Sequence, residues 1–344
     1  MLALLALTAA LLDTPAPPRA EVNDGCLACH GDTALNQTLP SGETRSLHVD
    51  AVTFGTSVHG EKLSCLDCHP DMSELPHPER KFASMRQASL AYYEQCKRCH
   101  YATFAKTLDS AHQAALARGD VTAPLCMDCH GTHDIVTPNQ PRGRISRTCA
   151  KCHEGVSRTY EKSVHGKALL ADNNPDVPVC NDCHRSHDVA GPHAEQWRSH
   201  TPELCASCHG DEQVMGKYGL STLVHRTYVS DFHGVTARLR GQDDPRNVPV
   251  VARCTDCHGV HDITKVDDPE SPVVKANLVK TCRQCHEDAT DNFPAAWLSH
   301  YEPSWEKSPL VKSVTVAYQV LIPFMIGGLL LQILLHLWRV VVNR

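Results

Sequence analysis

The feature that most constrains this chain is the five-residue pattern C-x-x-C-H, which occurs nine times and uses all 18 cysteines. In every copy a histidine directly follows the second cysteine. We number the copies one to nine in chain order and call them odd or even by that number. They are Cys26/Cys29/His30, Cys65/Cys68/His69, Cys96/Cys99/His100, Cys126/Cys129/His130, Cys149/Cys152/His153, Cys180/Cys183/His184, Cys205/Cys208/His209, Cys254/Cys257/His258 and Cys282/Cys285/His286.

This pattern is the attachment signature of c-type haem. The two thiols add to the haem vinyl groups, and the adjacent histidine becomes the proximal iron ligand. A zinc site does not need a histidine after each second cysteine, and a disulfide framework or a thioredoxin-like redox pair does not explain the repeated spacing. We therefore expect nine covalently bound haems, with all 18 cysteines as attachment residues and nine proximal histidines as metal ligands.

The start of the chain predicts export. Residues 2–12, LALLALTAALL, resemble the apolar region of a signal peptide, although no Lys or Arg precedes them. About a dozen apolar residues are too few to span a bilayer. We expect a signal peptide over residues 1–20, in keeping with haem attachment outside the cytoplasmic membrane.

The composition before residue 310 is poor for a conventional hydrophobic core. Aromatic residues make up 5% of the chain, and aliphatic runs are scarce before the C-terminal segment. A domain of this size needs a sizeable apolar core, which haem would supply. We expect a mainly α-helical fold with extensive loops, wrapped on a haem stack. The formal charge of −6, made more negative by haem propionates, disfavours a nucleic-acid partner.

The motifs alternate between two types. Odd motifs are followed by a helical-looking arm that ends in a histidine, as in CKRCHYATFAKTLDSAH and CAKCHEGVSRTYEKSVH. The arm histidines are His59, His112, His165, His233 and His300. Even motifs read C-x-D-C-H, and three of them continue x-x-H-D, which adds the near histidines His133, His187 and His261. Four two-haem modules therefore begin at Cys26, Cys96, Cys149 and Cys205, and a half module begins at Cys282.

A six-coordinate haem iron needs a second axial ligand. Nine of the 23 histidines are proximal and His336 lies in an apolar segment, which leaves 13 candidates. We select the five arm histidines, the three near histidines, and His77, which follows the degenerate second motif. A near histidine is too close to its own motif to cross to the far face of that haem, so we expect it to reach a neighbouring haem. His48, His193, His200 and His225 lie outside the repeat.

An aspartate follows each near histidine: Asp134, Asp188 and Asp262. Two interpretations stay open for it. Its carboxylate would either accept the imidazole N–H and orient the ligand, or cap a loop or helix as an ordinary surface aspartate.

Residues 314–338 form an apolar segment long enough to cross a bilayer. Arg339 and Arg344 follow it, which is compatible with a cytoplasmic C-terminus. We expect a nonahaem domain over residues 21–309, built from the repeated two-haem modules, and a transmembrane anchor over residues 310–344. The short distance from His300 to this segment would place the haem that uses His300 near the membrane surface. Gly328, Gln332 and His336 share one helix face, which is typical of helix–helix contact in a membrane.

The haem motifs, the SVHG-type arms, the C-x-D-C-H-x-x-H-D repeats and the ending WLSHYEPSWEKSPLV plus one helix resemble the membrane-anchored multihaem c-type cytochromes of anaerobic respiration, within the class III-like superfamily. The resemblance implies bis-histidine, low-potential haems acting as a wire, often beside a membrane b-type cytochrome that exchanges electrons with quinone. The helix here is C-terminal, unlike the N-terminal anchor of the familiar quinol-dehydrogenase cytochromes, which argues against direct quinol oxidation by this chain.

We therefore expect an electron carrier on the outer, periplasmic side of the cell inner membrane. It would link the quinone pool to periplasmic or extracellular redox proteins, and no catalytic residue is assigned. The alternative is a multihaem oxidoreductase acting on a small nitrogen or sulfur compound. That alternative needs one haem with an open coordination position, and the excess of histidines favours the carrier.

Overall fold

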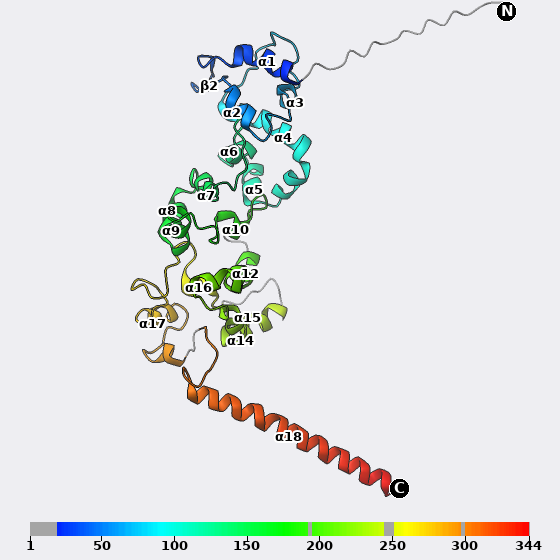
Figure 1. The fold of residues 1–344 in the computed structure, drawn as a ribbon, viewed down its shortest axis with the longest axis vertical. Helices are drawn as coiled ribbons and strands as arrows, with labels where there is room; N and C mark the ends of the chain where they lie inside the picture. The colour runs from blue at the N-terminus through cyan, green and yellow to red at the C-terminus, as the bar shows by residue number, and fades with distance from the viewer. Residues whose placement is uncertain (1–18, 192–194, 244–250, 297–299, 344) are drawn as a thin grey trace, which may run out of the picture. The chain divides into compact units, whose positions relative to one another are not determined.

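The computed structural model describes residues 19–191, 195–243, 251–296 and 300–343. Short helices joined by long loops dominate the described residues (Figure 1). This confirms the predicted mainly helical fold with little sheet. The predicted signal peptide lies outside the described residues except for Arg19 and Ala20, which open helix α1.

The chain divides into two compact units, residues 1–192 and 193–344. The first unit carries motifs one to six and the second carries motifs seven to nine, so the boundary falls between the third and fourth predicted modules. The elements of the first unit are α1 (Arg19–His30), β1 (Asn36–Thr38), β2 (Thr44–Ser46), α2 (Ala51–Thr56), α3 (Cys65–Cys68), α4 (Met85–Thr107), α5 (Ala111–Ala117), α6 (Cys126–His130), α7 (Gly143–Ala150), α8 (Glu154–Lys162), α9 (Val164–Leu170) and α10 (Cys180–His184).

The second unit also consists of short helices, followed by the long helix α18. They are α11 (Glu195–Ser199), α12 (Thr201–His209), α13 (Glu212–Met215), the 3-10 helix η1 (Gly216–Tyr218), α14 (Val224–Ser230), α15 (Phe232–Asp243), α16 (Cys254–His258), α17 (Leu278–Cys282), the 3-10 helix η2 (Phe293–Ala296) and α18 (Pro309–Val342).

The protein part of the core is small. Among the described residues only twelve apolar side chains are buried, and they are scattered along the chain. One cluster joins Leu39, Phe82 and Ala88, next to the antiparallel hairpin of β1 and β2. Arg45 and Arg80 stack over Phe82 at its edge, with guanidinium carbons 5.1 and 5.7 Å from the ring centre. Packing of this extent does not account for a folded chain of this length, which fits the expectation that haem supplies the missing apolar surface.

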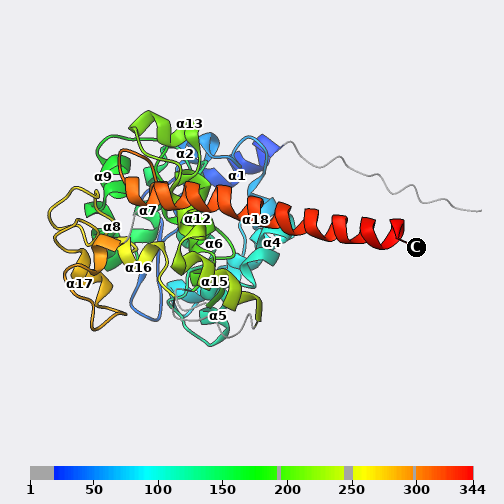
Figure 2. The same ribbon diagram turned by 90° about the horizontal axis from the view of Figure 1, so that it is seen from below.

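Helix α18 stands apart from this pattern because it is one continuous helix of 34 residues (Figure 1, Figure 2). Within the described residues it is the single helix long and apolar enough to cross a membrane, with a mean hydropathy of 2.2. Its large side chains are exposed along the whole length, from Leu310 to Val342. The helix contains the predicted apolar segment and extends beyond it at both ends.

Candidate haem-binding sites

Each even motif forms a single helical turn that begins at its first cysteine: α3, α6, α10 and α16. The middle aspartate of C-x-D-C-H closes this turn, because its carboxylate accepts the backbone N–H of the residue before the first cysteine. The four N···O distances are 2.7 Å for Ser64 to Asp67, 2.7 Å for Leu125 to Asp128, 2.7 Å for Val179 to Asp182 and 2.8 Å for Arg253 to Asp256. So short a helix is marginal by itself, and the carboxylate satisfies a backbone donor that would otherwise lack a partner.

Odd motifs occupy the opposite end of a helix. The first and seventh motifs are the last residues of α1 and α12, and the fifth and ninth begin in the last residues of α7 and α17. The third lies inside α4, where His100 interrupts the helical backbone with φ −104° and ψ 34°. Odd motifs therefore end or interrupt helices, whereas even motifs start them.

The two motifs of each module meet through their first cysteines. The side chains of these cysteines are hydrogen-bonding neighbours in four pairs: Cys26 with Cys65, Cys96 with Cys126, Cys149 with Cys180 and Cys205 with Cys254. Haem attachment consumes these thiols, but the contacts show that the two attachment points of a module lie side by side.

Six second cysteines lie at the junctions with a neighbouring module. Cys68 interacts electrostatically with Cys96 and Cys99, Cys129 with Cys152, and Cys257 with Cys282 and Cys285. Combined with the contacts inside the modules, this places consecutive motifs next to one another within each unit. The order is one to six in the first unit and seven to nine in the second.

The remaining second cysteines, Cys29, Cys183 and Cys208, are placed differently. Cys29 is exposed in the last turn of α1. Cys208 is also exposed, and its Sγ accepts a hydrogen bond of 3.9 Å from the Ser207 hydroxyl. Cys183 is half-buried and interacts electrostatically with Tyr160 of the same module. These surroundings do not test haem attachment, so the role assigned to the three thiols rests on the C-x-x-C-H pattern and stays a prediction.

Seven proximal histidines of the two units face a second histidine from the selected distal set. The ring-centre distances are 6.0 Å for His30–His77, 6.0 Å for His59–His100, 6.3 Å for His69–His133, 6.1 Å for His112–His153, 6.1 Å for His130–His187, 6.3 Å for His233–His286 and 6.2 Å for His258–His300.

The narrow range of these distances fits a shared metal ion. Two imidazole nitrogens about 2 Å from one metal, with ~1.1 Å from each nitrogen to its ring centre, place the ring centres about 6 Å apart. The residues present therefore fit a haem iron with one imidazole on each face. His165, His184, His209 and His261 also make contacts in the structure and stay predicted ligands.

Within the first unit, the pairs cross both module junctions in both directions. At the first junction the arm histidine His59 faces His100 of the next module, and the near histidine His133 faces His69 of the previous one. A backbone hydrogen bond of 2.9 Å from Val58 to Ile135 joins the two crossing segments.

The second junction repeats this arrangement. His112 faces His153 of the next module, and His187 faces His130 of the previous one. The crossing segments are again joined by a 2.9 Å backbone hydrogen bond, here from Ala111 to Val189. A near histidine thus faces the even motif before its own, as expected from its short distance to its own motif.

The histidines at the two ends of the repeat behave differently. His77 follows the second motif but faces His30 of the first. His300 follows the ninth motif and faces His258 of the eighth, although its sequence position groups it with the forward-reaching arms. Both therefore face a motif that comes before the one they follow.

A glycine directly after the arm histidine allows two helical segments to meet closely. A side chain at Gly60, Gly166 or Gly234 would overlap the carbonyl oxygen of Phe54, Tyr160 or Tyr228, respectively. In the third module Ser163 ends α8 and caps α9, since its hydroxyl accepts the Gly166 N–H at 3.0 Å. The sequence S-x-H-G at His59 and His165, and D-x-H-G at His233, therefore encodes a sharp bend that carries the histidine.

Burial holds several paired imidazoles in the neutral form that binds metal. Burial lowers the pKa of His69 and of His258 to about 4, and the facing His133 and His300 contribute to this lowering. Other polar groups orient the rings. His30 Nδ1 lies 2.7 Å from the Leu47 carbonyl oxygen, and His300 Nδ1 lies 3.3 Å from the Thr227 hydroxyl.

The aspartates after the near histidines shape the turn. Asp134 accepts the Thr132 N–H at 3.2 Å, and Asp262 accepts the Val260 N–H at 3.1 Å. Asp188 instead accepts a 2.8 Å hydrogen bond from Arg185 Nη1. These contacts favour the loop interpretation of the two that the sequence left open.

Sequence reasoning recognised the aspartate inside C-x-D-C-H but assigned it no role, and it missed the arginines that bind it. The signal was present, because all four even motifs carry this aspartate and no odd motif does. Three arginines pair with it: Arg86 with Asp128, Arg142 with Asp182 and Arg198 with Asp256.

Comparison with known proteins gives two matches. The cytochrome c3 family matches residues 122–210, which span motifs four to seven. A curated relative, high-molecular-weight cytochrome c of Nitratidesulfovibrio vulgaris (strain Hildenborough), is 24% identical over 184 residues. The match covers 48% of this chain and 31% of the relative, so the chain spans about a third of that protein's length. No solved structure matches.

Both matches are to haem proteins of the c type, and the family match falls on the alternating motifs and the histidines described above. Covalently bound haem is the cofactor that this family implies, and the paired imidazoles fit it. The chain is therefore similar to the cytochrome c3 family over motifs four to seven, and both matches support a multihaem c-type cytochrome.

Proposed function

We propose that this chain conducts electrons through nine covalently bound c-type haems. It would connect the membrane quinone pool, through a b-type cytochrome partner, with periplasmic or extracellular redox proteins in anaerobic respiration. The observation that carries the proposal is the combination of paired imidazoles with an unbroken series of neighbouring motifs in each unit. The haem iron would supply the one-electron carrier at each site, and the chain's residues hold and orient it.

The paired histidines favour a carrier over an enzyme. A multihaem reductase binds its substrate at an iron with one free axial position. At the seven paired sites, a second imidazole lies where such a substrate would bind. Electron transfer needs no bond between iron and substrate, so closed coordination does not impede it.

The eighth motif is the proposed point of contact with the membrane. His300 faces His258, and α18 begins at Pro309, only nine residues later. The segment between them is fixed to α14 by the His300–Thr227 contact and by an ion pair of Glu302 with Arg226. The eighth motif also lies next to both the seventh and the ninth. Electrons arriving there would have two routes, one toward motif seven and one toward motif nine.

Helix α18 would anchor the protein in the cell inner membrane with the haem domain on the periplasmic side. Its length and exposed apolar surface suit a bilayer. Gly328, Gln332 and His336 lie on one face, where glycine permits close approach and the polar side chains need partners. This face is the proposed contact with the b-type cytochrome.

The test uses membranes that contain the full chain and its native partners. A quinol analogue should reduce the haems in the wild type, and the double variant Gln332→Leu/His336→Leu should slow this reduction at least tenfold. Dithionite should still reduce every haem in the variant, which separates lost coupling from lost haem. The matched control Ile333→Leu, on another face of α18, should react at the wild-type rate. Equal rates in all three proteins would contradict the proposed partner contact.

Electron paramagnetic resonance of the oxidised protein tests the alternative. Low-spin signals for all haems are expected. A high-spin signal equal to one haem that changes with nitrite, hydroxylamine or tetrathionate would instead support a reductase.

A further inference from the structure

A recurring arginine–aspartate ion pair connects the two motifs of a module. The arginine lies shortly before the odd motif: Arg86 in the first turn of α4, Arg142 at the N-cap of α7, and Arg198 in α11 just before α12. The aspartate lies inside the even motif, two residues before its proximal histidine. The N···O distances are 3.4, 2.6 and 2.9 Å in chain order.

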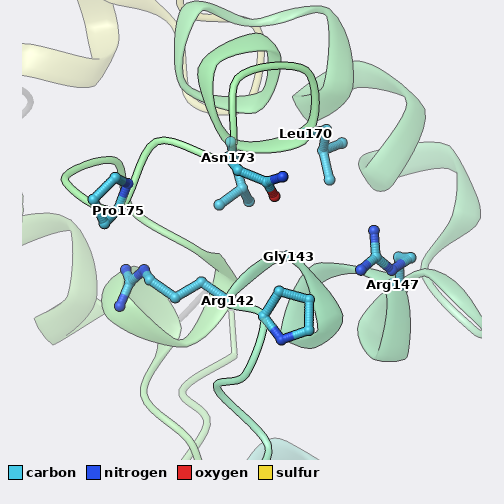
Figure 3. Close-up of a pocket in the computed structure, with 8 residues that line it drawn as sticks. Arg142, Gly143, Arg147, Leu170, Asn173 and Pro175 are labelled. Atoms are coloured by element: carbon cyan, nitrogen blue, oxygen red, sulfur yellow. The ribbon is translucent and has the colours of Figure 1, made fainter.

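Two of the three arginines also donate a hydrogen bond to the backbone of the segment that leads into the even motif. Arg142 Nη2 donates to the Val177 carbonyl at 3.1 Å, and Arg86 Nη2 donates to the equivalent carbonyl of Ala123. In the second unit the direction is reversed, because Arg253 Nη1 donates to the Arg198 carbonyl at 2.7 Å. Arg142 reaches from the start of α7 toward the chain that carries Pro175, on the opposite side of the cavity from Arg147 (Figure 3).

The aspartate therefore has two tasks. Its carboxylate accepts the backbone N–H at the start of the one-turn helix that carries the cysteines and the histidine. It also forms the ion pair with the arginine that lies before the odd motif. The pair is only partly exposed, with 35% and 39% of the side chains of Arg142 and Asp182 accessible. A charge in this position is screened less than one at the open surface.

We propose that these ion pairs are positioning groups that fix the even motif against the odd motif and balance the charge beside the even haem. A positive charge near a haem favours the reduced iron and raises its reduction potential, and a negative charge lowers it. The paired arginine and aspartate offset one another. This inference rests on the proposed electron-transfer function, since the potential of each haem sets its place in the wire.

The test is a redox titration of the purified full-length holoprotein carrying changes in the Arg142–Asp182 pair. Arg142→Gln leaves the aspartate uncompensated, so a component equal to one haem should shift to lower potential. Asp182→Asn keeps a side-chain acceptor for the Val179 N–H but leaves the arginine uncompensated, so the same component should shift to higher potential. The double variant should return toward the wild-type titration curve.

Two controls distinguish an effect of charge on the reduction potential from an effect of altered contacts between the two motifs. Tyr160→Phe removes a hydrogen bond of 2.5 Å to the Pro178 carbonyl, another link between the same two motifs, without changing any charge. It should leave the potential unchanged. Arg142→Lys keeps the charge but loses the planar fork of the guanidinium, and it should shift the component less than Arg142→Gln does.

Haem content is measured by mass spectrometry for every variant, so that a lost haem is not mistaken for a shifted one. Shifts of the same sign in Arg142→Gln and Asp182→Asn, or no shift in either, would overturn the proposal. Because the potentials are measured without membrane or partner, failure here is distinguishable from failure of the proposed function, which depends on quinol-driven reduction.

Discussion

Even and odd motifs share the same five-residue pattern, yet they differ in local structure and in where their histidines reach. An even motif starts a helix, closed by its own aspartate, and the near histidine after it faces the previous module. An odd motif ends or interrupts a helix, and the arm histidine after it faces the next module. At each junction described within the first unit, one histidine therefore faces the next module and another faces the previous module.

This difference shows how a repeat can build a continuous series of metal sites from local attachment motifs. Within each unit, histidines of neighbouring modules face each other's motifs, so we expect the folding of one module to depend on haem in the next. His77 and His300 depart from this scheme, because each faces the motif before the one it follows.

The largest expected effect comes from removing a near histidine, which faces a motif of the previous module. His133→Ala removes the imidazole that faces His69, so the haem of motif two, not that of motif four, should become high-spin and bind carbon monoxide when reduced. Carbon monoxide stoichiometry measures the number of affected haems. His48→Ala, outside the repeat, serves as the control.

A double variant decides which haem loses its ligand. His69→Ala/His133→Ala should affect one haem, because both residues serve the same site, whereas His130→Ala/His133→Ala should affect two. The reverse result would show that near histidines bind their own haem.

The next largest effect is expected from a substitution at the bend around an arm histidine that faces the next module. Gly60→Ala places a methyl group against the Phe54 carbonyl and should lower the free energy of unfolding by about 1–3 kcal/mol. Gly55→Ala in the same arm meets open space within a helix and should be neutral or slightly stabilising. Thermal unfolding compares the two variants, and an equal loss in both would argue against the close approach at Gly60.

A smaller effect is expected where the even repeat departs from its own pattern. Gly131 and Gly259 follow their motifs with φ of 82°, but Arg185 occupies the equivalent place with φ 65° and ψ 179°. This conformation is nearly restricted to glycine. Arg185→Gly should stabilise the protein by about 1 kcal/mol, after subtracting a weak exposed ion pair with Asp188. Gly259→Ala, the reverse change, should destabilise the protein. A loss of stability in Arg185→Gly would show that the backbone at Arg185 is not strained.

The smallest effect is a pH dependence in the first arm. The Thr53 backbone N–H and hydroxyl hold the pKa of Asp50 below its usual 3.8. The unfolded chain therefore takes up a proton first as the pH falls. The stabilisation is complete above about pH 4 and is lost as the pH falls through the folded pKa.

Asp50→Asn keeps the helix cap without titrating. Its unfolding temperature should fall less steeply than that of the wild type below about pH 4. Asp50→Ala, which has no cap, should be less stable than the wild type at neutral pH. Parallel acid profiles for wild type and Asp50→Asn would contradict a role for this carboxylate.

Much of the site was predictable because its chemistry is local. The mainly helical fold and the apolar C-terminal helix followed from spacing and composition, and the structure confirms both. The distal histidines were selected from recurrence, and seven of the nine selected residues face a proximal histidine within the two units. The Arg142–Asp182 pair was not predicted, because nothing in the spacing of the two residues indicates that their helices meet.

The sequence alone determined where haem attachment is predicted, since two thiols and a histidine within five residues need no distant partner to define the motif. It also determined the prediction that near histidines serve a neighbouring haem, because the peptide that connects them to their own motif is short. Only the tertiary structure decided which imidazole faces which motif. His69 and His133 meet because the chain between them folds back at a module junction, and that return depends on helix packing that no local spacing encodes.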